Sequence, residues 1–195
     1  RDDAACRPGV RGRPRLETAL DMSPGTRVTV EWVEVKEPAP KEDTVRLQAH
    51  ELGAAKFRRG EGAFFHAGAL YFATTLGGRK DRGQIFNLNL GNDGKADELE
   101  LLAESPNADV LDSPDNITVA PWGHVLMAED GADGNFLRGL TPEGYVYDIA
   151  FNAGGPGELA GPCFSPDGSA LFLNLFLEGK TVAIQGPFSS LGRPA

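Results

Sequence analysis

The residues best suited to phosphate chemistry lie in one short segment, Phe57-Arg58-Arg59-Gly60-Glu61-Gly62. In an extended chain, side chains two residues apart point to the same side, so Arg59 and Glu61 can face one ligand. A guanidinium binds phosphate through two parallel hydrogen bonds, and a neighbouring carboxylate suits a metal ion. Such a pair fits phosphoryl transfer, which depends on positioning and charge neutralisation. The spacing alone favours the alternative, a surface ion pair beside a glycine turn.

Two further carboxylates precede predicted strands. In Asp112-Ser-Pro-Asp115-Asn116, oxygens of Asp115 and Asn116 can point into a central channel and bind Ca²⁺. The alternative, which the spacing slightly favours, is an Asx turn in which these side chains bind nearby backbone. Glu158 is the third candidate, because it precedes a tight Gly-Pro turn that leads into an apolar strand.

Other site chemistries find less support. The segment Glu129–Asn135 has the composition of a calcium loop, but its spacing does not match an EF-hand, so we expect a solvated loop. The three histidines, His50, His66 and His124, lack the HxH or HExxH spacing of zinc hydrolases. There is no GxSxG motif for a serine nucleophile and no Walker motif for a nucleotide.

The elements that must position these residues are short strands repeated along the chain. A glycine turn followed by a hydrophobic strand recurs at Gly68, Gly123 and Gly168, at separations of 55 and 45 residues. This spacing is close to the length of a propeller blade, a four-stranded antiparallel sheet. In the turns Pro142–Gly144 and Pro166–Gly168, proline presets the first turn angle and glycine supplies a positive φ. The sequence therefore predicts an all-β fold with roughly three four-stranded blades, and a β-sandwich is the alternative.

Three blades do not close a ring, because propellers typically have four to eight. We therefore expect residues 28–188 to form a partial ring, with a loop or tail at residues 1–27 and a tail at 189–195. The chain is then a fragment, or a domain that residues outside it complete.

Two elements precede the first repeat. Arg27–Val35 alternates as a half-buried strand, with Val28, Val30 and Trp32 on one face. The spacing of apolar residues in 44–56 predicts a short helix. Its apolar side is expected to contain Val45, Leu47, Leu52 and Ala55.

Composition limits the class of protein. The chain has 195 residues, enough for one domain with a core, and a net charge of -9. That charge argues against a nucleic-acid partner, which needs a basic surface. The sequence has no run of 18 apolar residues, so no membrane span is expected.

Of the two cysteines, Cys163 lies in an apolar run and is expected to be a buried free thiol. A disulfide with Cys6 is the alternative.

Several motifs follow one another in order over roughly residues 25–188. They are Phe57–Gly62, Tyr71–Gly78, Gly83–Ile85, Ser113–Asn116, Glu129–Gly131, Leu137–Pro142, Glu158–Asn174 and Gly179–Pro187. Together they resemble the PhoX-type alkaline phosphatase family. The resemblance implies a six-bladed propeller, of which this chain is about half. It implies a monomeric enzyme that hydrolyses small phosphate monoesters, and export to the periplasm or beyond by the twin-arginine route.

The resemblance also implies cofactors and residue roles. Calcium and iron are expected, with the iron ligands largely outside this chain. Arg59 is the implied catalytic, phosphate-binding residue, and Glu61 is an implied calcium ligand. Asp115 and Glu158 are implied as further metal-binding carboxylates, and Pro162 as the donor of a backbone carbonyl.

The chain departs from the family near residue 177. Members commonly have a Gln before the turn there, whereas this chain has Phe176-Leu177-Glu178. Because a fold does not fix a function, two alternatives remain. One is a non-catalytic propeller that binds or scaffolds partners, and the other is a calcium-dependent, lactonase-like propeller.

Overall fold

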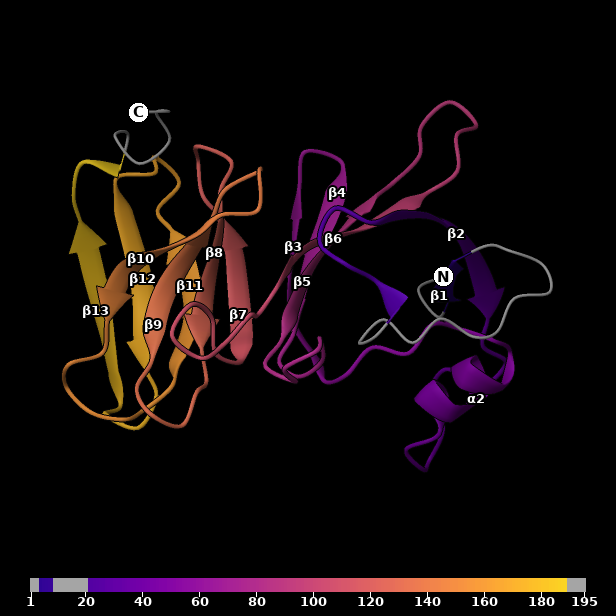
Figure 1. Cartoon of the computed structure of the whole chain (residues 1–195), viewed down its shortest axis with the longest axis horizontal. Helices are drawn as coiled ribbons and strands as arrows, with labels where there is room; N and C mark the ends of the chain where they lie inside the picture. The colour runs from indigo at the N-terminus through magenta and orange to yellow at the C-terminus, as the bar shows by residue number, and fades with distance from the viewer. Residues whose placement is uncertain (1–3, 9–20, 189–195) are drawn as a thin grey trace.

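The computed structural model describes residues 4–8 and 21–188, whose strands form three antiparallel sheets standing side by side (Figure 1). The first sheet contains β1 (Ala4–Pro8), β2 (Arg27–Glu34), β3 (Gly60–His66), β4 (Ala69–Thr74), β5 (Gln84–Asn89) and β6 (Glu98–Glu104), in the order β1-β2-β6-β5-β4-β3. The second contains β7 (Pro114–Val119), β8 (Val125–Glu129), β9 (Phe136–Leu140) and β10 (Val146–Phe151), in the order β10-β9-β8-β7. The third contains β11 (Leu159–Phe164), β12 (Ala170–Leu175) and β13 (Lys180–Gln185), in that order. Helix α2 (Val45–Glu51) lies between β2 and β3.

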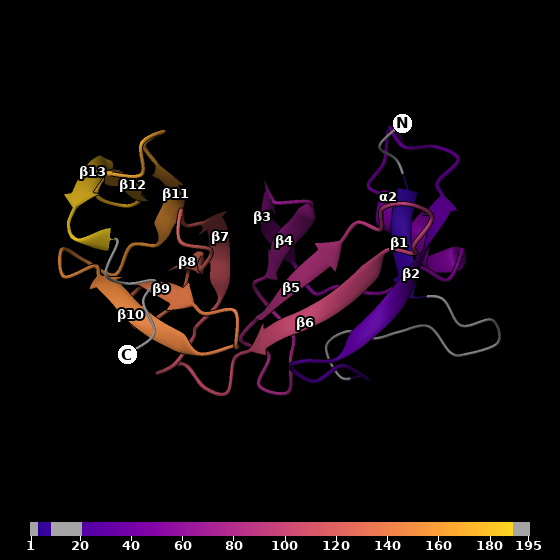
Figure 2. The same cartoon turned by 90° about the horizontal axis from the view of Figure 1, so that it is seen from above.

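The sheets spread like the blades of a fan. Figure 2 shows β3, β7 and β11 along one side of the fan, and β6 and β10 along the opposite side. β7 packs beside both β3 and β11, so the first strands of successive sheets are neighbours. This is the arrangement of inner strands around the axis of a propeller, as the repeat spacing predicts.

The three repeated glycines occupy equivalent positions. Each lies in the turn between the first and second strands of its sheet, with φ of 85° at Gly68, 90° at Gly123 and 71° at Gly168. These angles are in the left-handed region that glycine adopts without steric cost. The repeat therefore follows from one hairpin geometry used three times.

Two apolar cores lie between the sheets. The successive β8 residues Val125 and Leu126 are both buried and point to opposite faces, as in any strand. Val125 joins the core between the first and second sheets, and Leu126 joins the core between the second and third. The second sheet is thus covered on both faces, which explains the continuous apolar run of β8.

The first sheet differs from the prediction at its outer edge. β1 lies in the segment expected to be a loop or tail and pairs with β2, while β2 pairs with β6. The predicted face is correct for Val28 and Val30, which belong to a core of the first sheet, but it changes after them: Trp32 is 47% exposed whereas Val33 and Val35 are buried. Helix α2 causes this change, since its buried Ala49 packs with Val33 and Val35.

Other expectations on side-chain burial also need correction. Helix α2 forms where it is predicted, but Val45, Leu47 and Leu52 of its expected apolar side are exposed. Cys163 is a free thiol that is exposed rather than buried. The reason is a bulge in β11, which turns Cys163 outward and leaves Pro162 buried. The expected tail at residues 189–195 lies outside the described residues.

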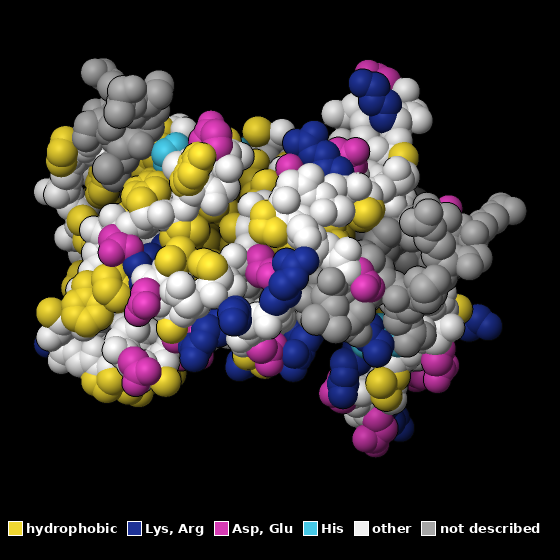
Figure 3. All heavy atoms as spheres, in the orientation of Figure 1, with side chains coloured by type: hydrophobic (Ala, Val, Ile, Leu, Met, Phe, Trp, Pro, Cys, Tyr) yellow, Lys and Arg dark blue, Asp and Glu magenta, His cyan; other side chains and the backbone are white. Residues whose placement is uncertain are grey.

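On the face shown in Figure 3, apolar side chains gather over the half of the molecule formed by β7–β13. The most exposed large hydrophobic residues there are Tyr145, Phe151, Phe176 and Leu177. In the described part of the chain, no helix has the length and apolar character needed to span a membrane.

Candidate functional site

The inner strand of each sheet carries a β-bulge near its first residues. The register shifts lie between Gly60 and Ala63 in β3, between Pro114 and Asn116 in β7, and between Ala160 and Cys163 in β11. A bulge re-aims side chains, and bulges are frequent beside active sites. These three contain Glu61, Asp115 and Pro162, all of which are site residues expected from the sequence. The same local device therefore presents one candidate residue from each blade.

Arg59 stands directly before the first bulge in a strained backbone conformation. Its φ is 52°, which is uncommon for a residue other than glycine. Its Nη2 lies 3.3 Å from Oε1 of Glu61, so the two side chains form the surface ion pair beside a glycine turn that the spacing alone favours. Both are partly exposed, at 54% and 36%, and an exposed ion pair contributes at most about 1 kcal/mol. The ion pair therefore adds little stability to offset the strain.

Strands β3 and β7 approach so closely that only glycine fits at position 62. A Cβ on Gly62 would lie 2.6 Å from the carbonyl oxygen of Asp115 and 2.7 Å from the backbone nitrogen of Ile117. The approach brings two carboxylates together. The pKa of Asp115 is raised by burial first, and then by the negative charges of Glu61 and Asp130.

The Asn116 side chain ties β7 to β11. Its Oδ1 accepts a hydrogen bond from the backbone nitrogen of Gly161 at 2.8 Å, and its Nδ2 donates to Asp115 at 2.5 Å. Neither bond is the Asx turn that the sequence slightly favours, because Gly161 belongs to the next blade. Asn116 thus orients Asp115 and fixes the start of β11.

Glu158 completes the group immediately before β11. Burial raises its pKa first, followed by the charge of Asp130 and a hydrogen bond with it, and then by the charges of Asp115 and Glu61. We call these four residues, Glu61, Asp115, Asp130 and Glu158, the carboxylate cluster. The negative charges of Glu61 and Asp130 therefore act on both Asp115 and Glu158.

The carboxylate cluster suits a hard cation in its chemistry. All its side-chain donors are carboxylate oxygens, the ligands that Ca²⁺ prefers, and a cation would relieve their mutual repulsion. Among the described residues, no three acidic, histidine or cysteine side chains converge tightly enough to enclose a metal ion. The donor types suit calcium, but the described residues alone do not enclose a metal ion.

The segment around Asp130 was expected to be a solvated loop, and this is wrong for three of its residues. Glu129 is 1% exposed and Asn135 is 0% exposed. Asp130 is half-buried, and its backbone nitrogen donates to the carbonyl of Ser113 at 3.0 Å, beside the β7 bulge. The run of acidic residues at the end of β8 was the sequence signal for a further site carboxylate. Which residue of the run lies near the site depends on the third sheet, whose strand β11 follows Glu158.

Glu178, where the chain departs from the resembled family, contacts a different group. Its Oε1 lies 3.4 Å from Nδ2 of Asn152, in the loop that precedes β11. A Cβ on Gly155 would lie 2.4 Å from the same oxygen, so the loop wraps closely around this carboxylate. Glu178 therefore supports the loop rather than joining the cluster.

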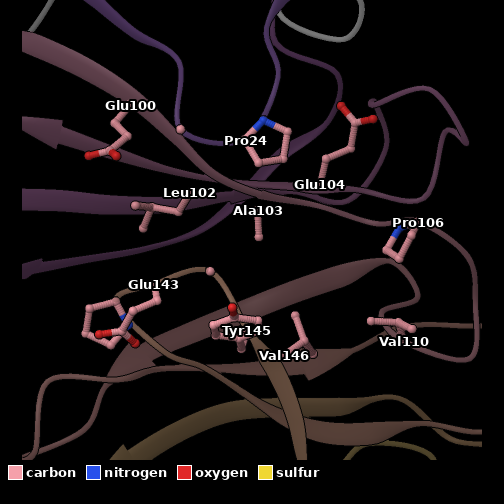
Figure 4. Close-up of a pocket in the computed structure, with 13 residues that line it drawn as sticks. Pro24, Glu100, Leu102, Ala103, Glu104, Pro106, Val110, Glu143, Tyr145 and Val146 are labelled. Carbon is pink, nitrogen blue, oxygen red and sulfur yellow. The ribbon is translucent and has the colours of Figure 1, made fainter.

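A groove on the outer side of the fan is separate from this site. It runs between β6, with Glu100 and Glu104, and the β9–β10 turn, with Glu143 and Tyr145 (Figure 4). Both β6 carboxylates already pair with arginines. No member of the carboxylate cluster lines this groove.

Replacing Gly62 with alanine should disturb the site through the fold. The new Cβ would collide with β7 backbone, so we expect a loss of about 1–3 kcal/mol in the free energy of unfolding. Gly60→Ala is the matched control, because a Cβ there meets nothing within 4 Å. Urea unfolding of the two variants checks this, and equal stability would contradict the close approach of β3 and β7.

The raised pKa values predict how pH affects stability without divalent cations. A carboxyl whose folded-state pKa is raised binds protons more tightly in the folded than in the unfolded protein. Its stabilising contribution to the free energy of unfolding is therefore complete at pH values below the ordinary carboxyl pKa, near 4. It is lost as the pH rises through the folded-state pKa. Asp115→Asn removes one such group, so the variant should be more stable than wild type at about pH 7 and gain little near pH 4. Urea unfolding at both pH values measures this difference, and a gain independent of pH would contradict it.

Comparisons with known proteins identify the family and the fold of the chain. The family model for alkaline phosphatase PhoX matches residues 11–179. The structure of Pseudomonas fluorescens PhoX in complex with vanadate, a transition state analogue, is similar with a TM-score of 0.62 and 20% identity, over 87% of this chain and 38% of that chain. The periplasmic gluconolactonase PpgL of Pseudomonas aeruginosa is similar with a TM-score of 0.53 and 14% identity, over 98% of this chain and 52% of that one. No curated protein matches the chain.

At these identities the two structures show the fold alone, and they confirm the β-propeller architecture predicted from the repeats. The chain spans well under two thirds of the length of either structure. The family model, in contrast, matches most of the chain and includes all five site residues expected from the sequence. On that match, the chain belongs to the alkaline phosphatase PhoX family.

Proposed function

We propose that this chain is part of a metal-dependent phosphatase that hydrolyses small phosphate monoesters. The observation that carries the proposal is the position of Arg59. Its guanidinium stands beside Glu61, and its charge lowers the pKa of Asp115 against the larger effects that raise it. A cationic side chain at the edge of a carboxylate cluster can hold a phosphate that metal ions in the cluster also bind.

Each residue then has a distinct role. Arg59 binds the phosphate and stabilises charge on its oxygens. Glu61, Asp115 and Glu158 hold calcium, and the carbonyl of Pro162 is a further oxygen donor for it. The bound metals would supply Lewis-acid polarisation of the phosphate. Iron is proposed as a second metal, with most of its ligands outside this chain.

The proposal extends to the whole protein. The chain covers 38% of the Pseudomonas fluorescens PhoX chain, so three further blades would complete a six-bladed ring. We propose a monomeric enzyme, exported to the periplasm or secreted by the twin-arginine route. Its partner is a small phosphate ester and not a nucleic acid, in keeping with the net charge of -9.

A lactonase and a non-catalytic module are the competing proposals. The gluconolactonase likeness spans 98% of this chain, but at 14% identity it supports a shared fold only. A strained arginine beside the carboxylates favours an anionic phosphate over a neutral lactone. Raised carboxyl pKa values, as at Asp115 and Glu158, are typical of functional sites and support a catalytic site over a scaffold.

Hydrolysis of p-nitrophenyl phosphate by the full-length protein tests these proposals together. We expect turnover that EGTA abolishes and added Ca²⁺ restores, and no cleavage of gluconolactone. Lactone cleavage without phosphatase activity would favour the lactonase. Absence of both reactions in the metal-loaded protein would favour the binding module.

A further inference from the structure

The third sheet, at one end of the fan in Figure 2, has one bare face. In β12, Leu171 and Leu173 are buried in the core shared with the second sheet. Successive side chains of a strand point to opposite faces, so Phe172 between them points away from that core. Phe172 is 40% exposed, and its cross-strand partners Cys163 and Ala183 are exposed as well. We call these three residues the bare row, because they cross all three strands without cover.

The equivalent row of the second sheet is buried. There Leu126 of β8 has Thr118 and Gly139 as its cross-strand partners. Leu126 is 0% exposed because it packs in one core with β12 residues of the third sheet, and Thr118 is 2% exposed. Leu126 follows the β8 residue that pairs with the last residue of β7, and Phe172 follows the β12 residue that pairs with the last residue of β11. Phe172 therefore has the position in its sheet that an adjacent sheet covers in the preceding one.

The third sheet is open at its outer edge too. The second sheet continues beyond its third strand, β9, to a fourth strand, β10. Among the described residues, the third sheet ends at its third strand, β13. An open edge presents unpaired backbone N–H and C=O groups, which natural proteins usually pair or cover. A bare face and an open edge on the same sheet both indicate that further polypeptide packs there.

A second copy of this chain does not fit as the next blade. Stacking two copies in the order of the blades would place the far face of the first sheet on the bare row. That face is already covered. Ala73 of β4 belongs to the core between the first two sheets, so its neighbour Phe72 points to the far face. The ring of Phe57 packs edge-to-face against Phe72 at 5.3 Å, and Met22, 1% exposed, belongs to the same cluster.

We propose that the bare row is the centre of a blade–blade interface, and that its partner is a further antiparallel sheet of the full-length protein, formed by residues outside those described. The third sheet then repeats toward this partner the contact that the second sheet makes with the third. The partner presents apolar side chains to Phe172 and buries the thiol of Cys163. The proposal rests on the proposed ring of the full-length protein and deepens it, because it names the surface on which the ring continues.

The experiment is modification of the full-length protein with N-ethylmaleimide, in buffer and in urea. Peptide mass spectrometry measures the label on Cys163, and light scattering of the same sample gives the oligomeric state. A buried thiol is inert until the protein opens, so we expect Cys163 to be labelled in urea and to stay unlabelled in the folded monomer.

Two alanine variants test the same interface through stability. Truncating a buried Phe leaves a cavity, so Phe172→Ala should shift the urea midpoint of the full-length protein to a lower concentration. Tyr145→Ala is the matched control, because Tyr145 is 72% exposed and lies outside the bare row, in the groove of Figure 4. We expect no shift from this variant. If Phe172→Ala does not fold, labelling of the wild type still decides.

Three results would overturn the proposal. They are rapid labelling of Cys163 in the folded monomer, equal urea midpoints of the two variants, and protection of Cys163 only in a dimer, which would assign the face to a second copy. The label reports burial and not catalysis. A protein that protects Cys163 but does not hydrolyse p-nitrophenyl phosphate would therefore contradict the proposed phosphatase activity and support this interface.

Discussion

Arg59→Ala is expected to lower phosphomonoesterase activity of the full-length protein by about 10²–10³-fold, the usual effect of removing one donor that stabilises transition-state charge. Arg59 is 54% exposed and forms an ion pair with Glu61, so its removal should leave the fold intact. Because the guanidinium acts on the phosphate itself, the loss should be largest in kcat. Steady-state kinetics with p-nitrophenyl phosphate measure it.

Arg58→Ala is the matched control for this experiment. Arg58 is the preceding residue and has similar exposure, but it pairs with Asp81 at 2.7 Å, away from the cluster. We expect nearly wild-type activity from this variant. Normal turnover by Arg59→Ala, or equal losses in the two variants, would show that Arg59 has no specific role.

The second large effect is on stability, at the ion pair between Arg138 and Glu129. The Nε of Arg138 donates to Oε1 of Glu129 at 2.9 Å, and the two side chains are 3% and 1% exposed. Arg138→Met would leave the Glu129 carboxylate buried without its partner, which typically costs about 3–5 kcal/mol. Urea or thermal unfolding measures this loss.

The same substitution at Arg27 supplies the control. Arg27 pairs with Glu100 at 3.0 Å, but its side chain is 59% exposed. An exposed pair contributes about 0–1 kcal/mol, so Arg27→Met should be nearly neutral. Equal effects of the two substitutions would contradict the claim that burial makes the Arg138 pair important.

The buried pair also supports the site. Glu129 accepts hydrogen bonds from the backbone nitrogen atoms of Asp112 and Phe136, both at 2.9 Å. The first of these bonds fixes the start of the loop that leads to Asp115. Arg138→Met should therefore weaken cation binding as well, as a secondary consequence of moving this loop.

The sequence predicts the fold well because its signals are local. A glycine with positive φ marks the same hairpin turn in each sheet, and those turns recur at blade spacing whatever the partner strands are. The burial of individual side chains in β2 and β11 was harder to predict. Trp32 alternates correctly within its strand, yet it is exposed because α2 packs against the other face of β2. Cys163 is exposed because a bulge, invisible in the residue pattern, changes its direction.

The site, like the fold, is only partly predictable from the sequence. Arg59 and Glu61 are two residues apart, so their ion pair beside a glycine turn could be predicted from the spacing. Asp130 could not be selected, because its contribution depends on Glu158, which belongs to another blade. The burial of Asn135 could not be predicted either. Its side chain bonds to Gly131 in its own loop and to Gly157 in the loop before β11, and these loops meet only after the sheets have packed.

The central claim is that carboxylates from three successive blades form one calcium site. Calorimetric titration of Ca²⁺ into full-length wild type, Asp115→Asn and Asp109→Asn tests it most directly, because Asp115 lies in the middle blade and Asp109 is an exposed aspartate outside the cluster. We predict that Asp115→Asn loses most of the calcium affinity while Asp109→Asn retains it. Unchanged calcium binding by folded Asp115→Asn would contradict the account.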